Sequence, residues 1–237
     1  MATITISARD GDGTFAAHVV RPKTSGGQRV PAGAVVLIQE IFGVNQAMRD
    51  TAAWVADMGF VAICPDLFWR IQPGIDITDK SEAEWKQAFE LFNKFDQAKG
   101  IDDLKATLAA ARELPGCNGR AGTMGYCLGG RLAMMMAAQS DAEVNISYYG
   151  VGLDNLLGGL SRVSKPLLLH IADQDEFFPP EGRAKVVEAV KGHAGIACHV
   201  YPDANHAFAR VGGVHWDGRS ATIANGRSAE ALVAALG

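Results

Sequence analysis

The chain has 237 residues, of which 48% are hydrophobic, and a formal net charge of −4 at pH 7. This length and apolar content are enough for one large buried core, so we expect a single domain over residues 1–237. The basic residues are scattered rather than clustered, which argues against nucleic acid or an anionic membrane surface as a partner.

The compartment is indicated by what the N-terminal segment and the cysteines lack. The first residues show no basic region, apolar core and cleavage site of a secretory signal, and no apolar run is long enough to span a bilayer. The four cysteines, Cys64, Cys117, Cys127 and Cys198, form no C-x-x-C pair. We therefore expect a cytoplasmic protein with reduced thiols.

The N-terminal third predicts a sheet edge followed by a crossover. Residues 3–22 alternate in polarity around a D-G-D-G turn, which is typical of an antiparallel hairpin. Apolar runs at 33–43 and 59–68 predict buried strands, and the segment 45–59 predicts a helix that ends at Gly59. This order implies a right-handed parallel crossover.

Strands and helices continue to alternate toward the C-terminus. Residues 79–116 predict two helices separated near Gly100. Further strands are expected at 144–150, 166–173 and 197–204, and further helices at 181–193 and 228–237. The pattern predicts an α/β fold: a mostly parallel sheet with helices on both faces and no large lid domain.

A cysteine stands between two glycines where a weak strand meets a helix-forming run. Gly125-Tyr126-Cys127-Leu128-Gly129 matches the nucleophile elbow of the α/β hydrolases, with cysteine in the place usually held by serine. The turn would place the sulfur at a helix N-terminus, where thiolate is favoured, and the Leu128 N–H would be an oxyanion-hole donor. The motif alone also fits a small buried cysteine in a tight turn.

A base and its orienting acid follow in the order that this fold uses. A predicted strand ends in a loop with Asp173, Asp175 and Glu176, and the next strand ends in a loop with His206. Asp175 as orienter and His206 as general base would complete a Cys-His-Asp triad. Asp173 is more typical of a turn or a helix cap.

The chain closely resembles the dienelactone hydrolases, or carboxymethylenebutenolidases, which are cysteine enzymes of the α/β-hydrolase fold. The motifs QEIFG, GYCLGG, YYGVGL, DQDEFFPP and NHAFAR carry the resemblance along nearly the whole chain. It implies a triad of Cys127, His206 and Asp175, with Glu40 as a fourth catalytic residue against the thiol. Ile41 would supply the second oxyanion N–H. It also implies a role in aromatic compound degradation.

The resemblance also concerns the binding of substrate. It implies that Arg210 holds the substrate carboxylate and that Tyr148 and Tyr149 line the pocket. The chain departs from the family where a second arginine is expected, because Trp85 stands there, and Phe89 replaces a tyrosine one turn later. Lys80 and Lys86 are candidates to compensate, although both fit a solvated helix face. The polar residue after the histidine is replaced as well, by Ala207.

Neither a metal nor another cofactor is expected. The histidines at 193, 199, 206 and 215 have no metal-ligand spacing, and D-G-D-G lacks the later glycine of a nucleotide-binding loop. The sequence thus predicts a monomer or small homo-oligomer that hydrolyses a small lactone or ester through a thioester on Cys127. The alternatives are a broader carboxylesterase or thioesterase on the same triad and a non-catalytic ligand-binding relative.

Overall fold

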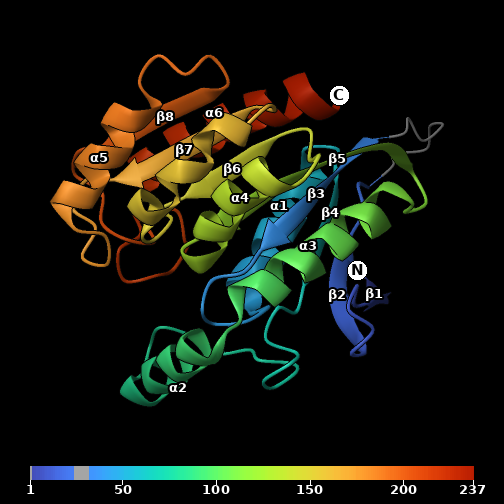
Figure 1. Ribbon diagram of the computed structural model, residues 1–237. Coiled ribbons are helices and arrows are strands. Elements are labelled where there is room, and N and C mark those ends of the chain that lie inside the picture. The colour runs from blue at the N-terminus through green and yellow to red at the C-terminus, as the bar shows by residue number, and fades with distance from the viewer. Residues whose placement is uncertain (1, 24–31) are drawn as a thin grey trace. The chain divides into compact units, whose positions relative to one another are not determined.

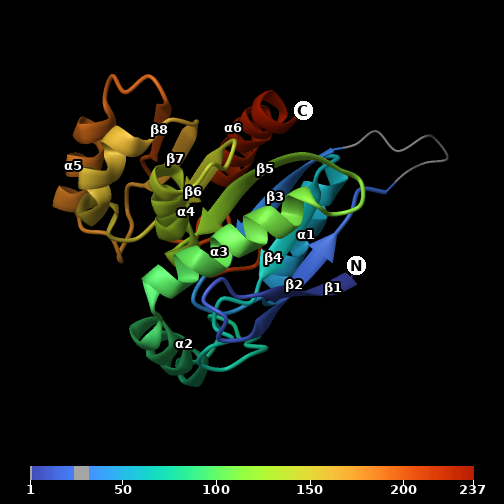
Figure 2. The ribbon, with the colours of Figure 1, turned by 45° about the vertical axis from the view of Figure 1, so that its right-hand side comes forward.

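The structure, a computed structural model, describes residues 2–23 and 32–237 and divides into two compact units. Unit 1 is formed by residues 1–122 and 236–237, and unit 2 by residues 123–235. The boundary falls inside strand β5 (Cys117–Tyr126). Figures 1 and 2 show the elements.

Unit 1 is built on four strands in the order β1-β2-β4-β3. β1 (Ala2–Ser7) and β2 (Thr14–Val20) form the predicted antiparallel hairpin, and β2 also pairs antiparallel with β4 (Val61–Pro65). β3 (Ala32–Ile38) pairs parallel with β4, as the crossover predicts. α1 (Gln46–Asp57) connects them and ends before Gly59, whose φ of +98° suits glycine.

Two more helices complete unit 1, and the break between them differs from the prediction. α2 (Glu82–Lys94) and α3 (Gln97–Arg112) are separated at Phe95, where the backbone is extended, and not near Gly100. Asp96 begins α3 by accepting the N–H groups of Ala98 and Lys99. Gly100 lies inside α3, where a Cβ would be 2.3 Å from the Phe95 ring, so it permits close packing. α1 and α3 cover opposite faces of the strands (Figures 1 and 2).

Unit 2 is parallel throughout. The end of β5, then β6 (Asn145–Tyr148), β7 (Leu167–Ala172) and β8 (Ile196–Tyr201) pair in chain order. α4 (Leu128–Gln139) and α5 (Pro180–Val190) lie on one face and α6 (Gly218–Leu236) on the other (Figures 1 and 2). The mostly parallel sheet with helices on both faces is confirmed.

Two features of unit 2 differ from the local sequence pattern. α6 begins at Gly218 rather than near Ser228, because Asp217 accepts the N–H groups of Arg219 and Ser220 and so caps an earlier start. The 3₁₀ helix η1 (Leu153–Arg162) was not predicted. It buries Leu153 and Leu160 in one core with residues of α4, β7 and α5.

Within the described ranges, no helix is both long and apolar enough to cross a membrane. The four cysteines are free thiols, with Cys64 and Cys127 buried.

Candidate active site

Cys127 occupies a strained turn between β5 and α4. Its φ of 56° and ψ of −114° lie outside the helix and strand regions that side chains ordinarily adopt. Two backbone hydrogen bonds hold this conformation: the Cys127 N–H donates to the Tyr148 carbonyl at 3.1 Å, and the Cys127 carbonyl accepts the Arg131 N–H at 3.1 Å. Cys127 thus stands at the N-terminus of α4.

Glycines make this turn possible because other backbone passes very close to it. A Cβ at Gly125 would lie 2.0 Å from the Gly129 carbonyl oxygen, and one at Gly130 would lie 2.5 Å from the Tyr148 carbonyl oxygen. Real Cβ atoms do not approach backbone oxygens so closely. The glycines of the motif are therefore required by packing around Cys127.

Asp175 and His206 meet in the interior of unit 2. His206 Nδ1 is 3.0 Å from Asp175 Oδ1 and 2.9 Å from Asp175 Oδ2, and both side chains are buried. His206 also hydrogen-bonds the Cys127 side chain. Since Nδ1 faces the carboxylate, Nε2 is the nitrogen that faces the sulfur. The structure thus brings Cys127, His206 and Asp175 together in one line of contacts.

The charges around His206 favour its protonated form. Burial by itself would lower the pKa of the imidazole, but the negative charge of Cys127 and the hydrogen bonds to Asp175 and Cys127 outweigh it and raise the pKa to about 10. A protonated imidazole that contacts both the Cys127 side chain and the Asp175 carboxyl group is placed to protonate a leaving group.

Backbone strain is concentrated in this region. Among the described residues, only three other than glycine have a positive φ: Cys127, Tyr149 and Ala207. The Tyr149 ring lies edge-on to His206, with ring centroids 5.2 Å apart, and Ala207 follows His206 directly. Strained conformations persist where surrounding contacts determine them, and they cluster at functional sites.

The other predicted residues of unit 2 have different surroundings. Tyr148 is fully buried and its hydroxyl contacts Ser228 and Asn225 on α6, so its ring belongs to the interior rather than to an open surface. Arg210 is half-buried in the turn after His206, where its backbone N–H donates to the Ala207 carbonyl at 3.0 Å. Leu128, the predicted oxyanion donor, is the first residue of α4.

Unit 1 carries the remaining candidates. Glu40 and Ile41 lie just after the end of β3, beyond Gln39, and are buried. Phe42, the next residue, packs edge-on against Trp85 of α2 with ring centroids 5.1 Å apart. The Trp85 ring stacks on Phe89 at 5.5 Å. The aromatic pair of α2 therefore lies beside the segment that contains Glu40 and Ile41.

The resemblance expects a second arginine on α2, at the position of Trp85, and the surroundings of this helix are aromatic instead. The Trp85 indole N–H donates to the Asp79 carbonyl at 3.0 Å, and Phe89 is 41% exposed. Lys86 is exposed on α2, as a solvated helix face predicts, whereas Lys80 is exposed in the turn before that helix. This part of unit 1 therefore presents aromatic surface.

Known proteins match nearly the whole of this chain. The model of the dienelactone hydrolase family matches residues 15–234. The carboxymethylenebutenolidase of Pseudomonas putida is 39% identical over 233 residues, which are 98% of this chain and 97% of that protein. This chain belongs to the dienelactone hydrolase family. Carboxymethylenebutenolidase 1 of Cupriavidus pinatubonensis is 37% identical over 229 residues, 97% of this chain and 95% of that protein.

Solved structures of dienelactone hydrolases have the same fold. The enzyme from Anabaena variabilis superposes with a TM-score of 0.71 at 17% identity, covering 100% of this chain and 98% of that one. A Klebsiella pneumoniae protein reaches a TM-score of 0.81 at 25% identity, covering 98% of this chain and 99% of that one. The chain is thus a dienelactone hydrolase-like ester hydrolase with the α/β-hydrolase fold.

Two polar residues hold the loops that carry Asp175 and His206. The sequence analysis did not predict either of them. The Asn205 side-chain oxygen accepts the His206 N–H at 2.6 Å and the Glu176 N–H at 3.3 Å, which ties the two loops together. Arg183 of α5 is buried and donates to the carbonyls of Asp173, Asp175 and Phe178. An arginine on an otherwise amphipathic helix gave no local signal of this role.

We expect Arg183→Ala to lower the free energy of unfolding by about 3 kcal/mol, because it leaves buried carbonyls without donors. Urea unfolding followed by circular dichroism measures the change. Lys185→Ala, an exposed change on the same helix, is the matched control and should stay within about 0.5 kcal/mol of wild type. Equal losses in the two variants would show that Arg183 does not hold the loop.

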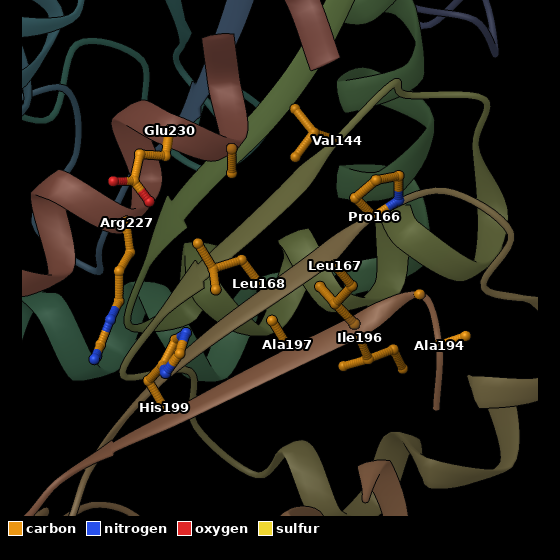
Figure 3. A pocket seen from close by; sticks show the side chains of 12 residues that line it. Val144, Pro166, Leu167, Leu168, Ala194, Ile196, Ala197, His199, Arg227 and Glu230 are labelled. Atoms are coloured by element: carbon orange, nitrogen blue, oxygen red, sulfur yellow. The ribbon is translucent and has the colours of Figure 1, made fainter. Parts of the chain in front are cut away.

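A separate groove of about 420 Å³ lies on unit 2, between β8 and α6. Its lining is largely aliphatic, with Leu167, Leu168 and Ile196 among its residues, while Arg227 and His199 stand together at one end (Figure 3). Burial and the charge of Arg227 lower the pKa of His199.

In the described parts of the chain, no three His, Cys, Asp or Glu side chains are grouped to hold a metal ion.

Proposed function

We propose that this hydrolase opens a lactone or carboxylic ester by nucleophilic attack of Cys127. The Cys127 thiolate adds to the carbonyl carbon, forming a C–S bond and a tetrahedral oxyanion. Collapse breaks the ester C–O bond, and the leaving alkoxide takes the Nε2 proton of His206, which leaves a thioester. Neutral His206 then removes a proton from water as the water attacks the thioester. The acid is released, and thiolate and imidazolium are restored.

One observation supports this proposal above the others: a buried cysteine in a strained strand-to-helix turn hydrogen-bonds a histidine whose other nitrogen is held by a buried carboxylate. Asp175 would keep the imidazole oriented and stabilise its charge. The N–H groups of Leu128 and Ile41 would stabilise the oxyanion, and Glu40 would contact the resting thiol.

We further propose that the substrate is dienelactone-like but less strictly anionic than dienelactone. The relatives named carboxymethylenebutenolidase support the lactone. Arg210 would bind its carboxylate, with the Tyr149 ring beside the pocket, while Tyr148 is interior and does not line it. Trp85 and Phe89 offer stacked aromatic surface in place of a second cation, which favours larger or neutral esters. This observation also supports the second candidate, a broader carboxylesterase or thioesterase.

The experiment that tests the function is a comparison of kcat/KM for dienelactone, a neutral lactone and an aryl acetate. Dienelactone should be hydrolysed at a rate that depends on Cys127, and at least one neutral ester should match it within about tenfold. A preference for dienelactone far above tenfold would contradict the relaxed specificity. A lack of turnover on all three would favour a non-catalytic binding protein.

Restoring a cation at position 85 should sharpen the preference for anionic substrate. We expect Trp85→Arg to raise kcat/KM for dienelactone about tenfold, mainly through a lower KM, because a guanidinium–carboxylate contact contributes about 1.4 kcal/mol. Kinetics on dienelactone and the aryl acetate measure it, and the neutral ester should gain nothing. Lys86→Arg, one residue along the same helix, is the control. An equal effect on both substrates would place residue 85 away from the carboxylate.

A further inference from the structure

A continuous chain of hydrogen bonds runs through the interior of unit 2, outside the proposed triad. It links side chains from β6, β7, β8 and α6. At one end, Arg227 contacts the Tyr201 hydroxyl at 3.1 Å, and this hydroxyl contacts His170 Nδ1 at 2.8 Å. The other ring nitrogen, His170 Nε2, contacts Ser228 Oγ at 3.0 Å. Ser228 Oγ then contacts the Tyr148 hydroxyl at 2.7 Å, which contacts Asn225 Oδ1 at 3.0 Å at the other end. Arg227 is the residue that stands at the end of the groove in Figure 3.

The chemistry of the two ends sets the direction of every bond. Arg227 can only donate, so Tyr201 accepts from it. At the other end the Asn225 side-chain oxygen accepts the Tyr148 hydroxyl proton, so Ser228 must donate to Tyr148. Ser228 is then left to accept from His170 Nε2–H.

His170 fits this direction because it is neutral. Burial, with the charges of His199 and Arg227, lowers the pKa of His170 to about 3. A neutral imidazole with its proton on Nε2 presents a bare Nδ1, which accepts the Tyr201 hydroxyl proton. Donor and acceptor alternate along the whole chain, so the buried network is satisfied in one arrangement.

This network connects to the strained turn through backbone. The Tyr148 carbonyl accepts the Cys127 N–H at 3.1 Å, and the Tyr149 N–H donates to the His170 carbonyl at 2.8 Å. The Tyr149 ring in turn lies against His206. Tyr148, whose side chain the network holds, therefore holds the Cys127 backbone, and His170 holds the backbone of Tyr149, whose ring contacts His206.

We propose that the hydrogen-bond chain from Arg227 to Asn225 is a positioning device, which fixes Tyr148 and through its carbonyl sets Cys127 against His206. The proposal rests on the proposed function of Cys127 as nucleophile. Its members are positioning residues, since they act through Tyr148 and Tyr149. A displacement of about 1 Å at a reacting group can reduce the rate about a hundredfold, so a network of this kind affects catalysis.

Ser228→Ala tests the proposal because it removes the one hydroxyl that joins His170 to Tyr148. We expect kcat for an aryl acetate to fall about tenfold with KM within about twofold, and alkylation of Cys127 by iodoacetamide to slow by a similar factor. Thr123→Val is the matched control: it removes a buried hydrogen bond of 2.7 Å to Asn145 in the same unit. The control should lower the melting temperature similarly and leave kcat and alkylation within about twofold.

The possible results distinguish a role in positioning Cys127 from a mere loss of stability and from a failure of the proposed function. Unchanged kcat and alkylation in Ser228→Ala, with only a stability loss like that of the control, would overturn the proposal. If Ser228→Ala does not fold, Tyr201→Phe breaks the link from Arg227 to His170 and is judged by the same criteria. Alkylation is followed on the Cys127 peptide by mass spectrometry, so it reports positioning even if another group proves to be the nucleophile.

Discussion

Cys127→Ala should reduce kcat/KM for every hydrolysed ester by about 10⁴-fold or more, because the proposed thioester cannot form without the sulfur. Alanine keeps the Cβ of the strained turn, whose backbone is held by the Tyr148 carbonyl and by Arg131, so the fold and melting temperature should change little. The assay is hydrolysis of an aryl acetate at neutral pH on protein checked by circular dichroism.

Cys127→Ser is the matched variant for this experiment. It preserves shape and supplies a nucleophilic oxygen, but a hydroxyl does not form the anion that pairs with imidazolium at neutral pH. We therefore expect activity about a hundredfold below wild type and above that of Cys127→Ala. More than a tenth of wild-type activity in Cys127→Ala would exclude Cys127 as the nucleophile.

Alkylation supplies a test of the thiolate that needs no substrate. Iodoacetamide at neutral pH should modify Cys127 ahead of Cys198 and Cys64, since burial raises the pKa of Cys198 to about 11 and that of Cys64 further. A Cys127 that reacts no faster than Cys198 would favour a non-catalytic binding protein.

Asp175→Asn should lower kcat/KM about 10³-fold, the second largest effect that we expect. The carboxylate contacts His206 Nδ1 through both oxygens and contributes to the raised pKa of the imidazole, so its loss removes charge stabilisation and orientation together. Without the carboxylate the pKa of His206 should be lower, so His206 should lose its proton at lower pH in the variant. The pH dependence of Cys127 alkylation should change with it.

Asp173→Asn is the control for the acid. Asp173 lies two residues earlier in the same loop and its side chain is 47% exposed. Arg183 donates to its backbone carbonyl and forms an ion pair of 4.0 Å with its carboxylate. Activity within about threefold of wild type is expected there. If Asp173→Asn were as damaging as Asp175→Asn, the loop as a whole and not one carboxylate would be responsible.

Local sequence was sufficient for most elements of this fold. The apolar runs of β3, β4 and β7, the alternation in the N-terminal hairpin and the Gly59 stop signal each reflect forces within a few residues of one another. Predictions were wrong where a distant or unusual partner decided the conformation. The sequence pattern predicts a helix break near Gly100, but Asp96 caps the start of α3, and Gly100 lies inside that helix with the Phe95 ring packed on it.

For the site, the sequence by itself determined the elbow motif, the chain order of Cys127, Asp175 and His206, and the family. Only the tertiary structure showed how Asp175, the acid that the sequence predicts, is held against His206, because Arg183 and Asn205 set the path of its loop. It also decided that Tyr148 is interior and joined to His170 through Ser228. The contact between Asp175 and His206 joins residues 31 positions apart and that between Tyr148 and Ser228 residues 80 apart, and such pairs leave no periodicity or motif in the sequence.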